Sequence, residues 1–111
     1  MNKIISKQWQ QGDVLGLPVK AVPAGCKTIK DKRGVVLAEG EISGHYHAIE
    51  DADVALFEHA DGRRFVVNSS KRTVTLTHQE HRPIAVAPGA YQIGIVREKD
   101  WFQDMVRSVV D

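Results

Sequence analysis

Residues 54–68 read VALFEHADGRRFVVN, and this stretch decides the fold class. Two runs rich in apolar residues, Val54 to His59 and Arg64 to Asn68, flank Asp61-Gly62, a dipeptide typical of the tight turn in a β-hairpin. Similar short runs rich in valine and isoleucine recur on both sides, separated by turn residues. They predict further strands at residues 13–21, 26–30, 34–41, 45–50, 73–78, 84–87 and 91–98. Such regular spacing is typical of an all-β sandwich or barrel with mainly antiparallel strands.

The chain of 111 residues fits one domain, residues 1–111, with a single core. We expect residues 1–99 to form the barrel or sandwich. From Asp100 onward Trp101, Met105 and Val109 recur at four-residue intervals, which predicts a short C-terminal helix over residues 100–111. Because this apolar stripe needs cover, as do exposed sheet edges, we also predict a homodimer with the tail at or near the interface.

Charge and composition exclude several classes of function. With 15 basic and 14 acidic residues, the net charge of +1 gives no broad positive surface, so we expect no nucleic-acid partner. The single cysteine, Cys26, forms no intrachain disulfide, and no apolar run reaches the length of a signal-peptide core or a membrane span. A cytoplasmic protein is therefore expected. Phosphate-binding loops, serine-esterase elbows and Cys-x-x-Cys pairs do not occur.

Four of the five histidines fall into two tight clusters, the least random feature of the sequence. The clusters read Gly44-His45-Tyr46-His47 and Thr77-His78-Gln79-Glu80-His81. Because side chains alternate along a strand, His45 and His47 share one face, and His78 shares a face with apolar neighbours. A turn before Arg82-Pro83 brings His81 back beside His78. The fifth histidine, His59, stands alone and is interpreted as an ordinary residue.

Neutral imidazoles that converge from two strands form a nitrogen-rich site suited to a divalent metal ion such as zinc, iron, copper, nickel or manganese. The nearest carboxylates, Glu41 and Glu80, either complete the set of ligands or orient a histidine. If three histidines bind and one position stays open for a small-molecule ligand, Glu80 is the best general base. If His45, His47, His78 and His81 all bind, the site is closed and structural. The sequence leaves both alternatives, and hence enzyme status, open.

The stretch Gly40 to His47 resembles the His-x-His half of the first cupin motif, and Gly12-Asp13 and Pro88-Gly89 resemble turns of such barrels. Glu50 resembles the glutamate that follows His-x-His in that motif. The resemblance implies a small cupin-like barrel with a mononuclear metal. The whole chain is also similar to small bacterial and prophage proteins that carry Gly-His-x-His followed by Thr-His-x-Glu-His, a likeness that implies no known activity.

A second hypothesis belongs to a different class. The protein is then a non-enzymatic interaction or structural module, such as a prophage accessory or virion-associated protein, whose histidines shape a polar pocket or a subunit contact. Metal content after purification without a His-tag separates the two hypotheses.

Overall fold

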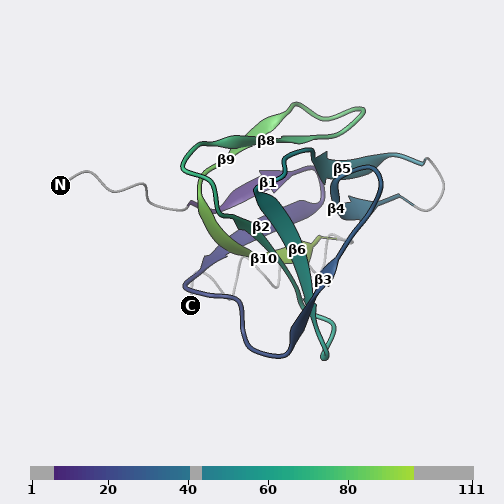
Figure 1. Ribbon diagram of the computed structural model, residues 1–111. Coiled ribbons are helices and arrows are strands. Elements are labelled where there is room, and N and C mark those ends of the chain that lie inside the picture. Colours follow the sequence, from purple (N-terminus) through teal and green to yellow (C-terminus); the bar gives the residue numbers. More distant parts are fainter. Residues whose placement is uncertain (1–6, 41–43, 97–111) are drawn as a thin grey trace, which may run out of the picture.

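A computed structural model describes residues 7–40 and 44–96 of the chain. These residues form ten β-strands and no helix (Figure 1). The strands are β1 (Trp9–Gln11), β2 (Val14–Val19), β3 (Cys26–Ile29), β4 (Val35–Glu39), β5 (Tyr46–Ile49), β6 (Val54–His59), β7 (Arg64–Asn68), β8 (Val74–Thr77), β9 (Ile84–Val86) and β10 (Gly89–Ile95).

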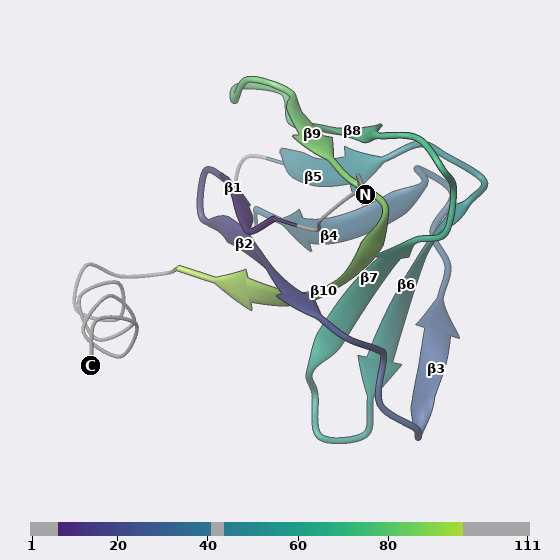
Figure 2. The ribbon, with the colours of Figure 1, turned by 90° about the vertical axis from the view of Figure 1, so that its left-hand side faces the viewer.

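The strands form two sheets, and every pair of neighbours is antiparallel. The larger sheet has the order β1-β2-β10-β7-β6-β3, and the smaller has the order β4-β5-β8-β9. Figure 2 shows the smaller sheet above the long strands of the larger one. The hairpin predicted at residues 54–68 is the β6–β7 pair, with Val54 opposite Asn68 and Gly62 at φ +95° in its turn.

The apolar side chains of the two sheets share one core. Leu56, Val66 and Tyr91 of the larger sheet are at most 1% exposed, as are Leu37, Ile49, Leu76 and Val86 of the smaller sheet. Burying each such side chain stabilises the fold by roughly 1.5–3 kcal/mol, so the core holds the sheets together. The strands that carry the histidines are thereby fixed against the larger sheet.

The prediction of an all-β, mainly antiparallel fold is confirmed. Within residues 7–40 and 44–96 no ladder joins the two sheets, so these strands form an open pair of sheets rather than a closed barrel. The cupin-like order stays a prediction. The predicted C-terminal helix over residues 100–111, and the dimer contact assigned to it, lie outside the described residues. Among the described residues no helix is long and apolar enough to cross a bilayer.

Each of the nine predicted strands overlaps an observed one. Eight have ends within two residues of the observed ends, whereas the prediction at residues 91–98 starts two residues after β10 begins and runs past its end at Ile95. Strands β6 and β7 match residue for residue. One strand was missed: β1, of three residues, has a single large apolar side chain, Trp9, and too few residues for an alternating pattern. This omission matters because β1 ends on Gln11, which reaches the histidines.

Candidate metal centre

The two histidine clusters lie side by side because β5 pairs with β8. Ala48 faces Thr77 in this ladder, so the next positions outward are His47, inside β5, and His78, just after β8. The ring centroids of His47 and His78 are 4.3 Å apart, and those of His78 and His81 are 4.5 Å apart. His45 lies 5.6 Å from His78, and His81 lies 5.9 Å from His47. We call these four residues the histidine cluster.

The members of the histidine cluster differ in burial. His47 is 4% exposed, whereas the side chain of His45 is 33% exposed. The prediction that both project from one strand face applies only inside a strand, and His45 precedes β5 beside Gly44, whose φ is +73°. The main chain of Tyr46 donates to the Gln79 side-chain oxygen at 2.8 Å, which ties the start of β5 to the loop after β8.

Gln11 joins this region to the larger sheet. Its side chain is 3% exposed, and its Nε2 donates to the carbonyl oxygens of Leu76, at 2.9 Å, and Arg82, at 2.8 Å. These two carbonyls lie before and after the loop that carries His78 and His81. A group with two carbonyl partners must be the NH₂ end of the amide, since a carbonyl oxygen only accepts. The loop is therefore held at both ends by one buried side chain.

The same amide fixes the protonation of His47. Gln11 Oε1 lies 2.8 Å from His47 Nδ1, and an amide oxygen only accepts, so Nδ1 must carry the hydrogen. The lone pair of the neutral ring is then on Nε2. His47 Nε2 lies 3.3 Å from Oδ1 of Asp13, the residue just before β2. A lone pair and a carboxylate oxygen repel each other unless a positive charge lies between them.

A proton on His47 Nε2 would supply the positive charge between this nitrogen and Asp13, but protonation of the ring is disfavoured. Burial lowers the pKa of His47, and the neighbouring His78 and His81 lower it further, although Asp13 opposes them. Burial likewise lowers the pKa of His78, with His81 and His45 acting in the same direction. Both rings are therefore held in the neutral form, which is the form that binds metal ions.

Glu80 orients one histidine and its main chain holds another. The carboxylate lies 2.6 Å from His45 Nδ1, the contact by which a carboxylate fixes the tautomer of a metal-binding histidine. Three roles were predicted for Glu80: completing the set of ligands, orienting a histidine and acting as a general base. This geometry is that of an orienting carboxylate, and the other two roles stay predictions. The backbone N–H of Glu80 donates to His78 Nδ1 at 3.0 Å, so the neutral His78 ring carries its hydrogen on Nε2.

A glycine makes room for His81. Gly12 occupies the turn between β1 and β2 with φ +57°, and a Cβ at this position would lie 2.5 Å from His81 Nε2. Any larger residue there would displace the His81 ring, because a carbon and a nitrogen that are not bonded stay more than 3 Å apart. The β1–β2 turn therefore contributes Asp13 and the space for His81.

The histidine cluster opens into a cleft of about 1180 Å³. Its lining includes Gly12 and Asp13 from the β1–β2 turn, Leu37 to Glu39 from β4, and Arg63 and Arg64 at the start of β7. Such a volume exceeds what one metal ion fills and is slightly above the roughly 300–1,000 Å³ of typical small-molecule sites.

As the side chains lie, no group of three or more His, Cys, Asp and Glu residues within the described ranges is placed to hold a metal ion. The rings are neighbours, yet their nitrogen atoms do not converge on one point. His59 lies apart on β6, where its Nδ1 contacts Asp61 at 3.0 Å, as expected of an ordinary residue. Glu41 lies outside the described residues.

Sequence reasoning missed two residues of the site, Gln11 and Asp13. The pair Gly12-Asp13 was interpreted only as a turn, since aspartate is common in turns for reasons of backbone geometry and gives no signal of the contact with His47. Gln11 offered a weaker signal: an uncharged polar residue two positions from Trp9 on the same face of a strand.

No curated protein and no solved structure matches the chain. A family described as a domain of unknown function, DUF8820, matches residues 10–96. The matched part includes the histidine cluster, Gln11, Asp13 and the cleft lining given above. Since it also covers most of the 111 residues, the chain belongs to the DUF8820 family.

Proposed function

We propose that this protein binds one divalent transition-metal ion in the histidine cluster, with the Asp13 carboxylate as a further ligand. The observation that carries the proposal is the contact of His47 Nε2 with Asp13 Oδ1 at 3.3 Å, in a ring whose other nitrogen is committed to Gln11. A neutral nitrogen and a carboxylate that face each other form two adjacent ligands for a cation. Zinc, iron, nickel and manganese all accept nitrogen and carboxylate ligands together.

Closing the set of ligands requires the His78 ring to turn. That turn breaks the hydrogen bond from the Glu80 N–H, which contributes about 1 kcal/mol. Binding of a metal ion by several protein ligands releases on the order of 10 kcal/mol, so the exchange is favourable. His81 is exposed in the same loop, and its ring adjusts without loss of any hydrogen bond given above.

The test is metal binding by untagged protein. We expect stoichiometric metal after purification or after titration with Zn²⁺ or Co²⁺, measured by elemental analysis and by isothermal calorimetry. His47→Ala removes a ligand and should weaken binding by about 100-fold or more, whereas His59→Ala, the matched control, should leave it unchanged. Protein that binds neither ion at neutral pH would refute the proposal and favour the interaction or structural module.

Catalysis is a separate matter from binding. Because Asp13 is a ligand in this proposal, a position facing the cleft stays open for a small-molecule ligand only if no more than two histidines bind beside it in a four-coordinate site. A Co²⁺-loaded sample distinguishes the two forms, because its visible absorption changes with added azide only where the anion reaches the metal. Homodimer formation stays a prediction, tested by the mass of the untagged protein in solution.

A further inference from the structure

The charged side chain of Arg64 faces the cleft from the larger sheet. Arg64 begins β7, and two and four residues further on lie Val66 and Asn68, which are buried at 1% and 3% exposure. Because side chains of a strand alternate, Arg64 shares their core-facing side. A charged residue on the core-facing side of a central strand is costly unless it has a partner or a function.

The partners of Arg64 leave its guanidinium incompletely satisfied. Its Nη1 donates to the carbonyl oxygen of Leu37 at 3.2 Å. Leu37 is the extra residue of a β-bulge between Val36 and Ala38, so its carbonyl lies outside the regular ladder. Within the part of the chain that the structure describes, the Nε–H of Arg64 is buried without a hydrogen bond, and the carboxylate oxygen paired with it, on Glu58, is 3.6 Å away. This ion pair is too long to count as a hydrogen bond.

The other charged groups given in the lining have closer partners. Arg33 donates to Glu39 at 2.8 Å, and Arg63 donates to Asp61 at 2.8 Å. Asp13 and Glu80 lie against the histidines at the other end. Arg64 is thus the lining cation whose ion pair is longest, and it lies where a ligand in the cleft can reach it.

The two ends of the cleft are close. Leu37, which holds Arg64, is followed by Ala38, and Ala38 faces His47 in the β4–β5 ladder. From ordinary backbone and ladder spacings, the guanidinium and His47 Cα lie no more than about 15 Å apart along this path. A small organic molecule in extended form spans much of that distance.

We propose that the cleft binds a small organic carboxylate, with its carboxylate group on Arg64 and its far end at the histidine cluster. Arginine recognises carboxylate and phosphate in the same forked geometry. A carboxylate group brings one negative charge to the guanidinium, whereas a phosphate group brings up to two to the same point and is repelled more strongly by Glu39 of the cleft lining. The second carboxylate of a dicarboxylate would lie at the far end of the cleft, beside the metal. The inference rests on the proposed metal site only for the contact at the far end.

The experiment uses succinate as the probe and succinamide, of similar shape and without charge, as its control. In Zn²⁺-loaded protein succinate should bind at least about 10-fold more tightly than succinamide, by calorimetry and by NMR chemical shifts. Arg64→Met should weaken succinate binding by about 10- to 100-fold and leave the affinity for Zn²⁺ within about 2-fold. Arg64→Lys, which keeps the charge, should retain part of the affinity. Arg72→Gln, which removes a cation outside the cleft lining, should retain all of it.

The outcomes separate this inference from the metal proposal. Equal binding of succinate and succinamide, or undiminished succinate binding by a folded Arg64→Met variant, overturns the inference whether or not metal binds. If the protein binds no metal, the same titration of metal-free protein still decides, since succinate binding that depends on Arg64 supports the carboxylate site by itself. If Arg64→Met does not fold, Arg64→Gln takes its place. Weaker succinate binding by Arg64→Gln supports the inference, and unchanged binding overturns it.

Discussion

Two buried amides bridge regions of this molecule in the same way, yet their acceptor atoms meet different partners. Asn68 Nδ2 donates to the carbonyls of Arg72, at 3.0 Å, and Val86, at 3.1 Å, just as Gln11 Nε2 donates to two carbonyls near the histidines. The Asn68 oxygen accepts from the backbone and the hydroxyl of Ser70. The Gln11 oxygen accepts from a single group, the ring of His47.

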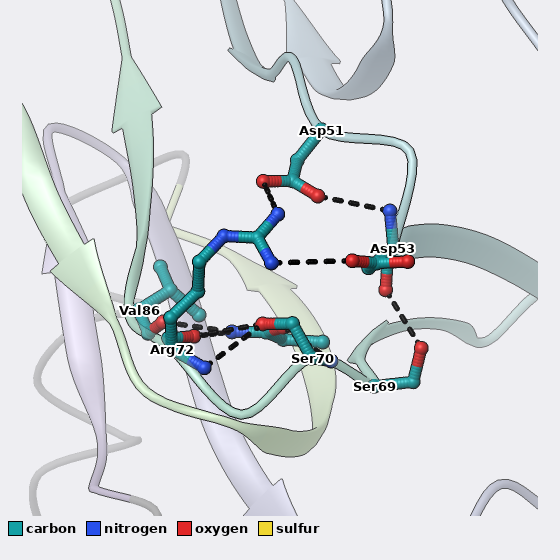
Figure 3. Close-up of polar contacts among 7 residues, drawn as sticks. Asp51, Asp53, Ser69, Ser70, Arg72 and Val86 are labelled. Atoms are coloured by element: carbon teal, nitrogen blue, oxygen red, sulfur yellow. Dashed lines mark hydrogen bonds and ion pairs between the residues drawn. The ribbon is translucent and has the colours of Figure 1, made fainter.

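The surroundings of the two amides differ in charge. Figure 3 shows Arg72 between Asp51 and Asp53, at 2.6 and 3.2 Å, with Ser69 donating to the Asp53 carbonyl. Opposite charges meet there, and the pKa of Asp51 is lowered, chiefly by the backbone N–H of Asp53. Around Gln11 four imidazoles crowd together beside the carboxylates of Asp13 and Glu80, and the pKa values of His47 and His78 are lowered. The Asn68 region is thus a cluster of matched charges, whereas the region around Gln11 is the proposed metal site.

The largest expected effect comes from removing each amide in turn. Gln11→Ala and Asn68→Ala should each destabilise the protein by about 2–4 kcal/mol, since each removes hydrogen bonds to two carbonyls, one of them buried, and opens a cavity. Chemical denaturation measures both losses. Only Gln11→Ala should also weaken Zn²⁺ binding, by about 10- to 100-fold, because only Gln11 holds a proposed metal ligand, His47. Equal effects of both variants on Zn²⁺ affinity would erase the distinction between the two regions.

A smaller effect is expected from alanine at two turn glycines. Gly12→Ala should destabilise by about 2 kcal/mol and displace His81, because φ is +57° and the new Cβ would overlap the ring. Gly62→Ala has φ +95° but nothing within 4 Å of the new Cβ, so it carries the backbone strain alone. Comparison of the two melting temperatures isolates the overlap. If Gly62→Ala also lost Zn²⁺ affinity, the overlap of the new Cβ with the His81 ring would not be the cause of the loss in Gly12→Ala.

The two regions should also respond to acid at different pH. Burial keeps the pKa of His47 and His78 below 6.5, so the unfolded chain binds protons first as the pH falls. Metal-free protein should therefore lose stability below pH 6.5, down to the lowered folded-state values. The lowered pKa of Asp51 acts only below about 4, where the unfolded carboxylate is protonated first. Melting curves of His47→Gln and Asp51→Asn assign the two ranges, and an unchanged profile in His47→Gln would contradict the assignment.

The smallest effect is expected at the Arg72 ion pairs, because the Arg72 side chain is 59% exposed and water screens its charges. Arg72→Gln should lower the melting temperature slightly at low salt and not at all at high salt. Zn²⁺ affinity should stay unchanged. A large loss of stability in this variant would mean that the Asn68 region depends on charge more than its exposure indicates.

The elements that sequence reasoning placed well are those whose local signals agree. In the β6–β7 hairpin the turn dipeptide and the apolar runs point to one structure, and the observed strands match the predicted ranges. The gathering of the histidines was predicted from strand alternation and from a turn before Arg82, although His45 and His78 lie just outside β5 and β8 and the pairing of these strands brings them together. The hairpin prediction needed no contacts between distant parts of the chain.

The parts that could not be predicted depend on such distant contacts. Gln11 lies in a strand too short to show a pattern, and its carbonyl partners are 65 and 71 residues further along the chain. The core-facing position of Arg64 was not predicted, because Arg64 follows Asp61-Gly62 in a short polar run. Its meaning depends on a bulge at Leu37, which no local pattern in the sequence indicates.

The long separation between Gln11 and its partners has a consequence for how the protein matures. Closing a loop of 65 to 71 residues costs chain entropy before any contact is gained, so we expect the Gln11 contacts to form late in folding. A ribosome that has made β1 must still extend the chain past Arg82 before both carbonyl partners of the amide are present. Tight metal uptake would then require a chain that has folded through Arg82, and fragments ending before His78 would lack two of the proposed ligands.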